Sequence, residues 1–258
     1  NSLNINGIST FAGDLSIADK IIHTGDTNTA IRFPDADTFT VETGGIEAIR
    51  VDSSQRLLIG HTATDDRGGY DSALQVSGNG PGADDTSISI GRWTANAAAP
   101  ALVLSKSRNG TIGSHTVVQD GDYLGLIKFL GDDGTDYELG AEIQAIVGSG
   151  VGNDNMPTDL LFMTNGGSEY TAERLRITSA GRVGIGTTNP GAKLDVYGNV
   201  NVTGISTLSG PVGLGSNLNV VGISTFDLGI NIPDSSISTP RRLNLGDEQD
   251  LKLYHLAG

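Results

Sequence analysis

The stretch that decides the fold is "ERLRITSAGRVGIGTT", residues 173–188, because the chain carries it twice. The earlier copy, "EAIRVDSSQRLLIGHT" at residues 47–62, lies 126 positions before it and shares seven identical residues. In both copies, short runs that alternate apolar and polar residues flank a small polar turn. This pattern predicts a β-hairpin with one apolar face.

The repeat extends beyond the hairpin. The first copy continues as "SALQVSGN" (72–79) and the second as "AKLDVYGN" (192–199), and the connecting loop of the first copy is six residues longer. The predicted unit is therefore strand, turn, strand, loop, strand. A hairpin of this size is marginal alone in water. It must pack its apolar face either on further coils of the same chain or on the same hairpin of neighbouring chains.

Other parts of the chain also read as β-structure. A shorter alternating repeat recurs as "LNINGISTF" (3–11), "VNVTGISTL" (200–208) and "LNVVGISTF" (218–226). The middle, residues 77–165, has longer apolar runs and the single tryptophan, and it predicts a small globular β domain. Within it, "ELGAEIQAIVG" (138–148) could form one or two helical turns by propensity, but its apolar residues alternate and favour a strand.

Composition excludes several classes of protein. Glycine is abundant (37 residues) and aromatic residues make up only 5%, which favours turn-rich β structure. The formal charge of −14 repels nucleic acid and anionic membranes, so neither is a predicted partner. The absence of cysteine excludes a disulfide-stapled module, and no run approaches the roughly 20 apolar residues of a membrane span. The first residues show no export signal. The chain starts without methionine and stops within a strand-like run, so we expect a piece of a longer protein.

The "GIG" at residues 184–186 invites a phosphate-binding reading. A phosphate loop needs its glycines between a strand and the start of a helix. Here Gly184 and Gly186 lie inside an alternating strand, and Asn189-Pro190-Gly191 follows where a helix would begin. We interpret the glycines instead as places of close chain approach or a bulge.

Metal and catalytic motifs are weak. The four histidines lack zinc-ligand spacing, and no nucleophile elbow is present. Glycan hydrolysis needs a pair of carboxylates in a cleft, whereas the acidic residues of this sequence lie in Gly/Asp turns. Asp132, Asp133 and Asp136 are the best calcium candidates, although Asp/Gly pairs are also ordinary turn formers. We predict no cofactor, no metal and no enzymatic activity.

The second copy resembles a segment found repeatedly in bacteriophage tail fibres and related virion fibre proteins, often upstream of a self-cleaving chaperone domain. The middle, "GDYLGLIKFLGDDGTDYELGAEIQAIV", is similar to a β module of the same family, and "LNLGDEQDLKLYH" and the "GISTF" repeats look like fibre proteins of marine cyanobacterial phages. Thirteen residues of this chain match the first motif: Arg174, Arg176, Ile177, Ser179, Gly181, Gly184, Ile185, Gly186, Thr187, Pro190, Lys193, Leu194 and Val196.

This resemblance implies an all-β, elongated homotrimeric fibre in the virion, with intertwined hairpin shaft segments around a globular module. Three copies around an axis would bury a face that one hairpin cannot. The predicted segments are a β-repeat shaft (1–76), the module (77–165), the hairpin repeat (166–199) and a second shaft (200–258). A single-chain β-solenoid is the alternative fold; it needs three or more coils, and two long repeats are visible.

The predicted function is a non-catalytic tail fibre that supports host attachment. Its expected partners are further copies of itself, other tail or baseplate proteins, and a glycan or protein of the host surface. The alternatives are a tailspike-like glycan hydrolase and a capsid or neck decoration fibre. Trp93 and Tyr123 are candidate receptor contacts because aromatic rings can stack on sugars; the alternative is that both are core residues.

Overall fold

The computed structural model describes residues 7–79, 86–167, 170–204 and 206–207. Chain contacts divide the protein into Asn1–Asn201 and Val202–Gly258, and the strands of the described residues belong to the first unit. The repeat at 218–226 and nearly all of the predicted shaft segment 200–258 lie outside the described residues.

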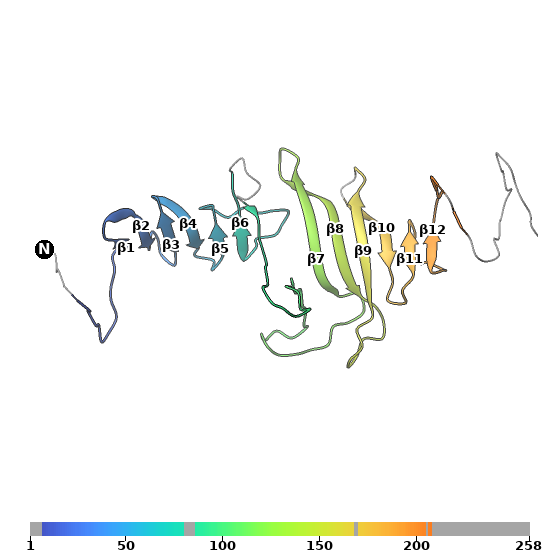
Figure 1. Cartoon of the computed structure of the whole chain (residues 1–258), viewed down its shortest axis with the longest axis horizontal. Coiled ribbons are helices and arrows are strands. Elements are labelled where there is room, and N and C mark those ends of the chain that lie inside the picture. Colours follow the sequence, from blue (N-terminus) through green and yellow to red (C-terminus); the bar gives the residue numbers. More distant parts are fainter. Residues whose placement is uncertain (1–6, 80–85, 168–169, 205, 208–258) are drawn as a thin grey trace, which may run out of the picture. The chain divides into compact units, whose positions relative to one another are not determined.

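The described residues form strands and no α-helix, arranged in two six-stranded sheets (Figure 1). No helix that could cross a bilayer occurs in this part of the chain. The first sheet comprises β1 (Lys20–His23), β2 (Asp26–Arg32), β3 (Phe39–Thr43), β4 (Ile46–Val51), β5 (Leu57–Ile59) and β6 (Leu74–Val76). The second comprises β7 (Tyr123–Asp132), β8 (Tyr137–Val147), β9 (Thr158–Asn165), β10 (Thr171–Ile177), β11 (Val183–Ile185) and β12 (Leu194–Val196).

Both sheets have the same topology. Each strand pairs with its neighbour in sequence, antiparallel throughout except for the last pair, β5–β6 and β11–β12, which is parallel. The predicted unit is thus confirmed twice, as β4–β5–β6 and β10–β11–β12. The alternating run at 138–148 is confirmed as a strand, β8. Strands β9 and β10 pair directly, so residues on both sides of position 166 share one sheet. The division of the chain into four segments stays a prediction.

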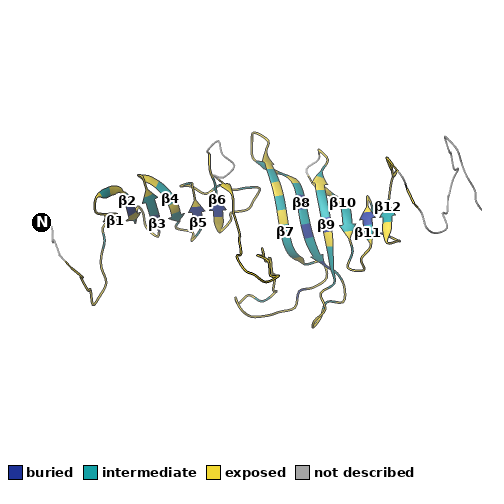
Figure 2. Ribbon diagram, in the orientation of Figure 1, coloured by how far each residue is buried: buried dark blue, intermediate teal, exposed yellow. Residues whose placement is uncertain are grey.

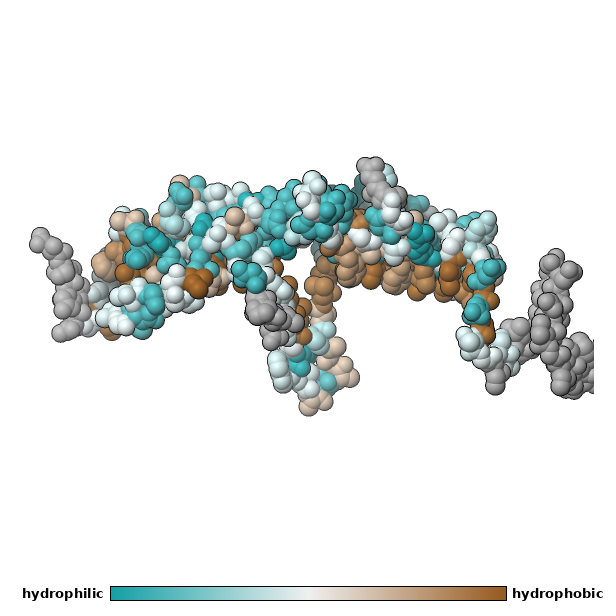
Figure 3. Space-filling view, turned by 90° about the horizontal axis from the view of Figure 1, so that it is seen from above, coloured by the Kyte–Doolittle hydropathy of each residue, from teal (hydrophilic) through white to brown (hydrophobic). Residues whose placement is uncertain are grey.

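The pairing register sorts side chains into two contrasting faces. Since cross-strand partners project to the same side, one face of each sheet carries an unbroken apolar row. In the first sheet this row is Ile21, Ile31, Val41, Ile49, Ile59 and Val76. In the second it is Ile127, Ile143, Phe162, Leu175, Ile185 and Val196. We call this side of each sheet the apolar face and the other side the polar face. In Figure 3, hydrophobic residues gather along the lower side of the second sheet, at the right of the picture.

Little of the burial occurs on the apolar face, where Val147 lies by register two residues beyond Ala145 on β8. Figure 2 shows few buried positions on the strands. The buried apolar residues of the described chain are Ala30, Leu58, Val118, Val147 and Leu161. By register, Leu58 and Leu161 belong to the polar face, where they pair with Arg50 and Arg176. One copy of the chain therefore builds almost no core of its own.

Candidate interaction surface

The apolar face is the most unusual surface of the molecule. In the first sheet, its larger side chains are 36–51% exposed: Ile21, Ile31, Phe39, Ile49, Leu57, Ile59 and Leu74. The second sheet exposes Ile127, Phe129, Leu160, Ile177, Ile185 and Leu194 in the same way. Contiguous apolar surface of this extent marks a site of interaction with another molecule.

The polar face is organised by one ion pair that occurs in both copies of the repeat. Arg50 donates to both carboxylate oxygens of Glu47, at 2.6 and 2.7 Å, and Arg176 does the same to Glu173, at 2.9 and 2.7 Å. Residues three apart on a regular strand face opposite sides. A β-bulge in each copy, at Ala48 and Arg174, supplies the extra residue that brings both members to the polar face.

Arg176 also reaches the neighbouring strand. Its Nη1 lies 2.6 Å from Asp159, whose other oxygen accepts the amide of Ser179 at 2.7 Å. The side chains of Arg176, Glu173 and Asp159 are all less than 20% exposed. Hydrogen bonds to Glu173 and then Asp159 raise the pKa of Arg176, which stays charged at every accessible pH. This network ties β9, β10 and the following turn together.

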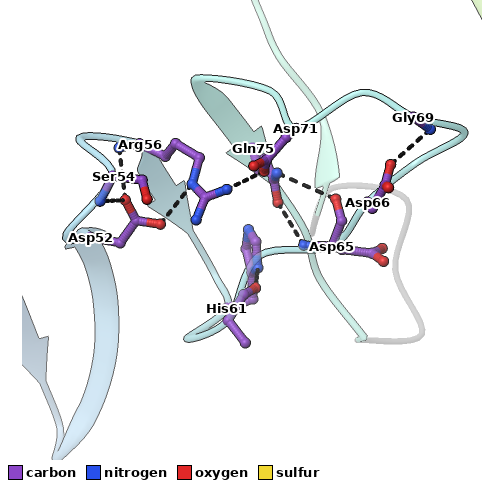
Figure 4. A network of polar contacts seen from close by, with 10 residues as sticks. Asp52, Ser54, Arg56, His61, Asp65, Asp66, Gly69, Asp71 and Gln75 are labelled. Carbon is purple, nitrogen blue, oxygen red and sulfur yellow. Dashed lines mark hydrogen bonds and ion pairs between the residues drawn. The ribbon is translucent and has the colours of Figure 1, made fainter.

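The hairpin turn is also the same in both copies. Asp52 and Arg56 close the first turn through their main chains at 3.1 Å, and Thr178 and Arg182 close the second at 2.9 Å. Asp52 additionally accepts the amides of Ser54 and Arg56 and the Nε of Arg56 (Figure 4). These donors, led by the Arg56 amide, lower the pKa of Asp52.

After the turn, one arginine in each copy, Arg56 or Arg182, binds the crossover loop that leads to the third strand. Arg56 pairs with Asp71 in the loop of residues 60–73, and Arg182 donates to the carbonyl of Pro190 at 3.0 Å in the loop of residues 186–193. The longer loop is held further by Gln75, whose side chain bonds the main chain of Asp65 (Figure 4). By these contacts, and because a Cβ at Gly184 would meet Thr187, each loop lies over the polar face at the last strands of its sheet.

The glycines of "GIG", Gly184 and Gly186, allow the chain of the second copy to pack closely against the backbone of Thr187 and Tyr197. A Cβ at Gly184 would lie 2.6 Å from the carbonyl of Thr187, and one at Gly186, where φ is +70°, would lie 3.0 Å from that of Tyr197. The interpretation of close chain approach is confirmed. In the first copy, the position of Gly184 is taken by Leu58, which is fully buried beneath a loop six residues longer.

Two polar side-chain atoms are buried without a hydrogen-bond partner in the described structure. They are Oγ1 of Thr40 and Nε2 of His61. The other ring nitrogen of His61 lies 2.6 Å from the carbonyl of Ala63. Sequence analysis did not single out either residue, since neither belongs to a recognisable motif.

The calcium candidates lie in the turn between β7 and β8. The structure brings Asp133 and Asp136 together with Glu138, with carboxylate oxygens within 4.8 Å of one another, whereas Asp132 is not in this group. Asp133 accepts the amides of Thr135 and Asp136 at 2.8 and 3.2 Å, which lowers its pKa. Asp132 accepts the amide of Gly134 at 2.7 Å. Both side chains thus act as turn formers, and the prediction of no metal, with these residues as the best calcium candidates, stays untested.

The candidate receptor contacts are both accessible in the single chain. Trp93 is 93% exposed and lies against Gly91, and Tyr123, the first residue of β7, is 48% exposed. The two rings make no contact with each other among the described residues. Their role as receptor contacts stays a prediction.

Comparison with known proteins rests on structure. No family model and no curated protein matches the sequence. Among solved structures, the carboxy-terminal domain of the bacteriophage T5 L-shaped tail fibre is similar with a TM-score of 0.52 and 16% identity, over 81% of this chain and 99% of that chain. The same domain with its intra-molecular chaperone domain gives a TM-score of 0.53 and 15% identity, over 84% of this chain and 71% of that chain. The chain therefore has the all-β fold of a phage tail-fibre domain, as predicted.

Proposed function

We propose that this chain is a non-catalytic structural subunit of a virion tail fibre, that it assembles as a homotrimer, and that the fibre supports attachment to a host cell. The observation that carries the proposal is the open apolar face that runs along both sheets. A side chain buried from such a face gains roughly 1.5–3 kcal/mol. Self-association is therefore strongly favoured over a soluble single chain.

Strand length supports three copies. The strands of the first sheet have three to seven residues. A strand of five residues spans about 17 Å, and three such strands forming a triangle lie about 5 Å from its centre. That distance is half of the roughly 10 Å at which two sheets pack face to face. Three apolar faces thus meet at the spacing that one layer of side chains fills.

The same fold in a phage tail-fibre domain supports placing the protein in the virion, next to other tail or baseplate proteins. The chemistry of the polar face supports a structural role. Its carboxylates at positions 47, 52, 159 and 173 are engaged by arginines and main-chain amides rather than poised in a cleft. Contact with a host glycan or protein is assigned to exposed aromatic residues of the middle of the chain, Trp93 and Tyr123.

Light scattering tests the assembly. We expect a mass of three times the 26.6 kDa chain. Ile185→Asp, on the apolar face, should reduce this mass toward that of one chain, whereas Ala180→Asp, in the exposed turn of the same hairpin, should leave it unchanged. A wild-type mass of one or two chains contradicts the trimer.

Attachment and the absence of catalysis need separate assays. Labelled trimer should bind bacterial cells or their purified surface polysaccharide, and Trp93→Ala should weaken that binding without changing the mass. Incubation with the polysaccharide should release no sugar. Release of reducing ends by the pure protein would contradict the non-catalytic role.

A further inference from the structure

Residues 86–118, which we call the arm, join the two sheets and contain no strand in this structure. The arm has the composition of a β-strand region. Ile88 and Ile90 alternate with serines, and "ALVLS" follows at residues 101–105. An apolar run of this kind is ordinarily paired and half buried.

Within the arm, residues 88–106 take part in no backbone–backbone hydrogen bond among the described residues, whereas Arg108 and Ser114 further along donate backbone hydrogen bonds to Thr116 and Thr111. Only the amides of Asn96 and Ala98 find side-chain acceptors, both local. Nearly all backbone groups of native proteins are paired, and apolar strands bury theirs. Nineteen consecutive residues without such a bond therefore need a partner that the described part of the chain does not supply.

The side chains of the arm are equally without cover. Ile88, Leu102 and Val103 are each 70–75% exposed, more than any residue of the apolar rows on the strands. These positions cannot contribute to the stability of a single copy. Their exposure on both sides of the run at 101–105 indicates a strand that is to be covered on two faces.

The arm is nevertheless held in place at its base. Arg108 donates to both carboxylate oxygens of Asp122, at 2.6 and 2.7 Å. Leu104 packs over Gly125 so closely that a Cβ there would lie 2.8 Å from its Cδ1. Gly125 pairs with Ala145, a position of the apolar face. The arm therefore leaves the sheet from the face through which copies are proposed to associate.

The chain's own sheet does not receive the arm. Strand β7 is the last strand of its sheet and has no strand on its outer side among the described residues. Leu104 lies on the face of β7 rather than beside its edge, so the arm of the same copy does not extend the sheet. The edge of β7 is one acceptor that a neighbouring copy offers.

We propose that the arm is an exchanged element: residues 88–106 of one copy form β-strands that pair with the backbone of a neighbouring copy. This inference rests on the assembly proposed above and goes beyond it, because copies could associate through the apolar faces alone. Backbone pairing between copies adds hydrogen bonds to the interface and covers Ile88, Leu102 and Val103, which are 70–75% exposed in a single copy.

Hydrogen exchange with mass spectrometry tests the inference on a sample whose mass is measured by light scattering. In a sample with the mass of three chains, we expect peptides covering 88–106 to exchange on the order of 100-fold more slowly than the β7–β8 turn at 132–136. Peptides from β8 and β9 provide the protected reference. A trimer whose arm exchanges as fast as that turn overturns the exchange of arms and leaves the assembly intact. A mass of one chain overturns both.

A pair of variants gives a second readout. Leu102→Asp changes a side chain that is solvent-exposed in one copy, so it should be neutral unless a partner covers it. We expect it to lower the melting temperature of the assembly or to reduce its mass. Ala180→Asp, at an exposed position outside the arm, is the control. Equal melting temperatures for both variants and the wild type contradict the proposal.

Discussion

The guanidinium of Arg176 holds the carboxylate of Glu173 through two hydrogen bonds, and Arg50 holds Glu47 in the same way 126 positions earlier. In both copies a bulge makes the pairing possible. The ion pair is thus part of the backbone design of the repeat.

Arg176→Gln should destabilise the protein by about 2–3 kcal/mol, because it leaves Glu173 and Asp159 as shielded, unpaired charges. Arg174→Gln is the matched control: it makes the same change of charge on the same strand, at an exposed side chain whose hydrogen bond among the described residues goes to Thr164. Chemical denaturation measures both. Equal losses would mean that net charge, rather than the network, accounts for the effect.

Arg50→Gln should cost less than Arg176→Gln. Arg50 holds Glu47 alone, whereas Arg176 also bonds Asp159 at 2.6 Å. We expect a difference of about 1 kcal/mol, the contribution of one additional charge-assisted hydrogen bond. Denaturation midpoints of the two variants provide the comparison, and an equal or larger loss for Arg50→Gln would contradict this ranking.

Gln55→Gly should stabilise the first hairpin. Gln55 has a φ of +66°, and the equivalent Gly181 has a φ of +67°. A side chain in this left-handed region costs roughly 1 kcal/mol that glycine avoids. The reverse change, Gly181→Gln, should lower stability by a similar amount. Thermal melts of the two variants check the prediction, which requires shifts of opposite sign.

Gly184→Ala should displace the crossover loop and cost about 2 kcal/mol, because the added Cβ meets the Thr187 carbonyl at 2.6 Å. Gly191→Ala, in the same loop, places its Cβ no closer than 3.7 Å to any atom and should change stability by less than about 0.5 kcal/mol. Denaturation midpoints decide between them. A tolerated Gly184→Ala would show that the loop can move at no cost.

The pair of Arg108 and Asp122 should make the arm sensitive to acid. The guanidinium, followed by the amide of Gln119, holds the folded pKa of Asp122 well below its ordinary 3.8. A depressed folded pKa contributes stability above the unfolded value of 3.8, and this contribution is lost as the pH falls below it toward the folded pKa.

Asp122→Asn should therefore lower the melting temperature at pH 7, and the difference from wild type should shrink at pH 3. Asp120→Asn, a neighbouring exposed carboxylate, controls for the change of charge. A melting-temperature difference that is constant from pH 7 to pH 3 would contradict the assigned role of Asp122.

The strands were predictable because their signal is local. Alternation at residues 138–148 and around the turn of 173–188 specifies β8, β10 and β11, and repetition identifies the third strand of each unit. The direction of that third strand was not predictable, because a short apolar run has the same sequence pattern whether it pairs in a parallel or an antiparallel direction. The register that aligns six apolar residues into one row depends on bulges at Ala48 and Arg174, which interrupt the alternation that reveals a strand.

The polar side of the candidate surface was harder to predict for a similar reason. Glu173 and Arg176 were visible as residues shared by the two copies, but their spacing of three suggests opposite faces on an ideal strand. The calcium candidates illustrate the converse. Asp132, Asp133 and Asp136 are neighbours in sequence, yet the turn uses Asp132 as a cap for Gly134 and brings Glu138 beside the other two.

The two crossover loops differ in length, fourteen residues at 60–73 and eight at 186–193, yet each ends in a strand with the same register on the hairpin. Both lie over the side of the sheet that faces away from the apolar rows. In the proposed assembly, insertions in these loops would change the outer surface of the molecule and leave the contacts between copies unaltered. Such a fold would separate positions that are free to diversify from positions that assembly constrains, so that new outward-facing features could be added to an unchanged scaffold.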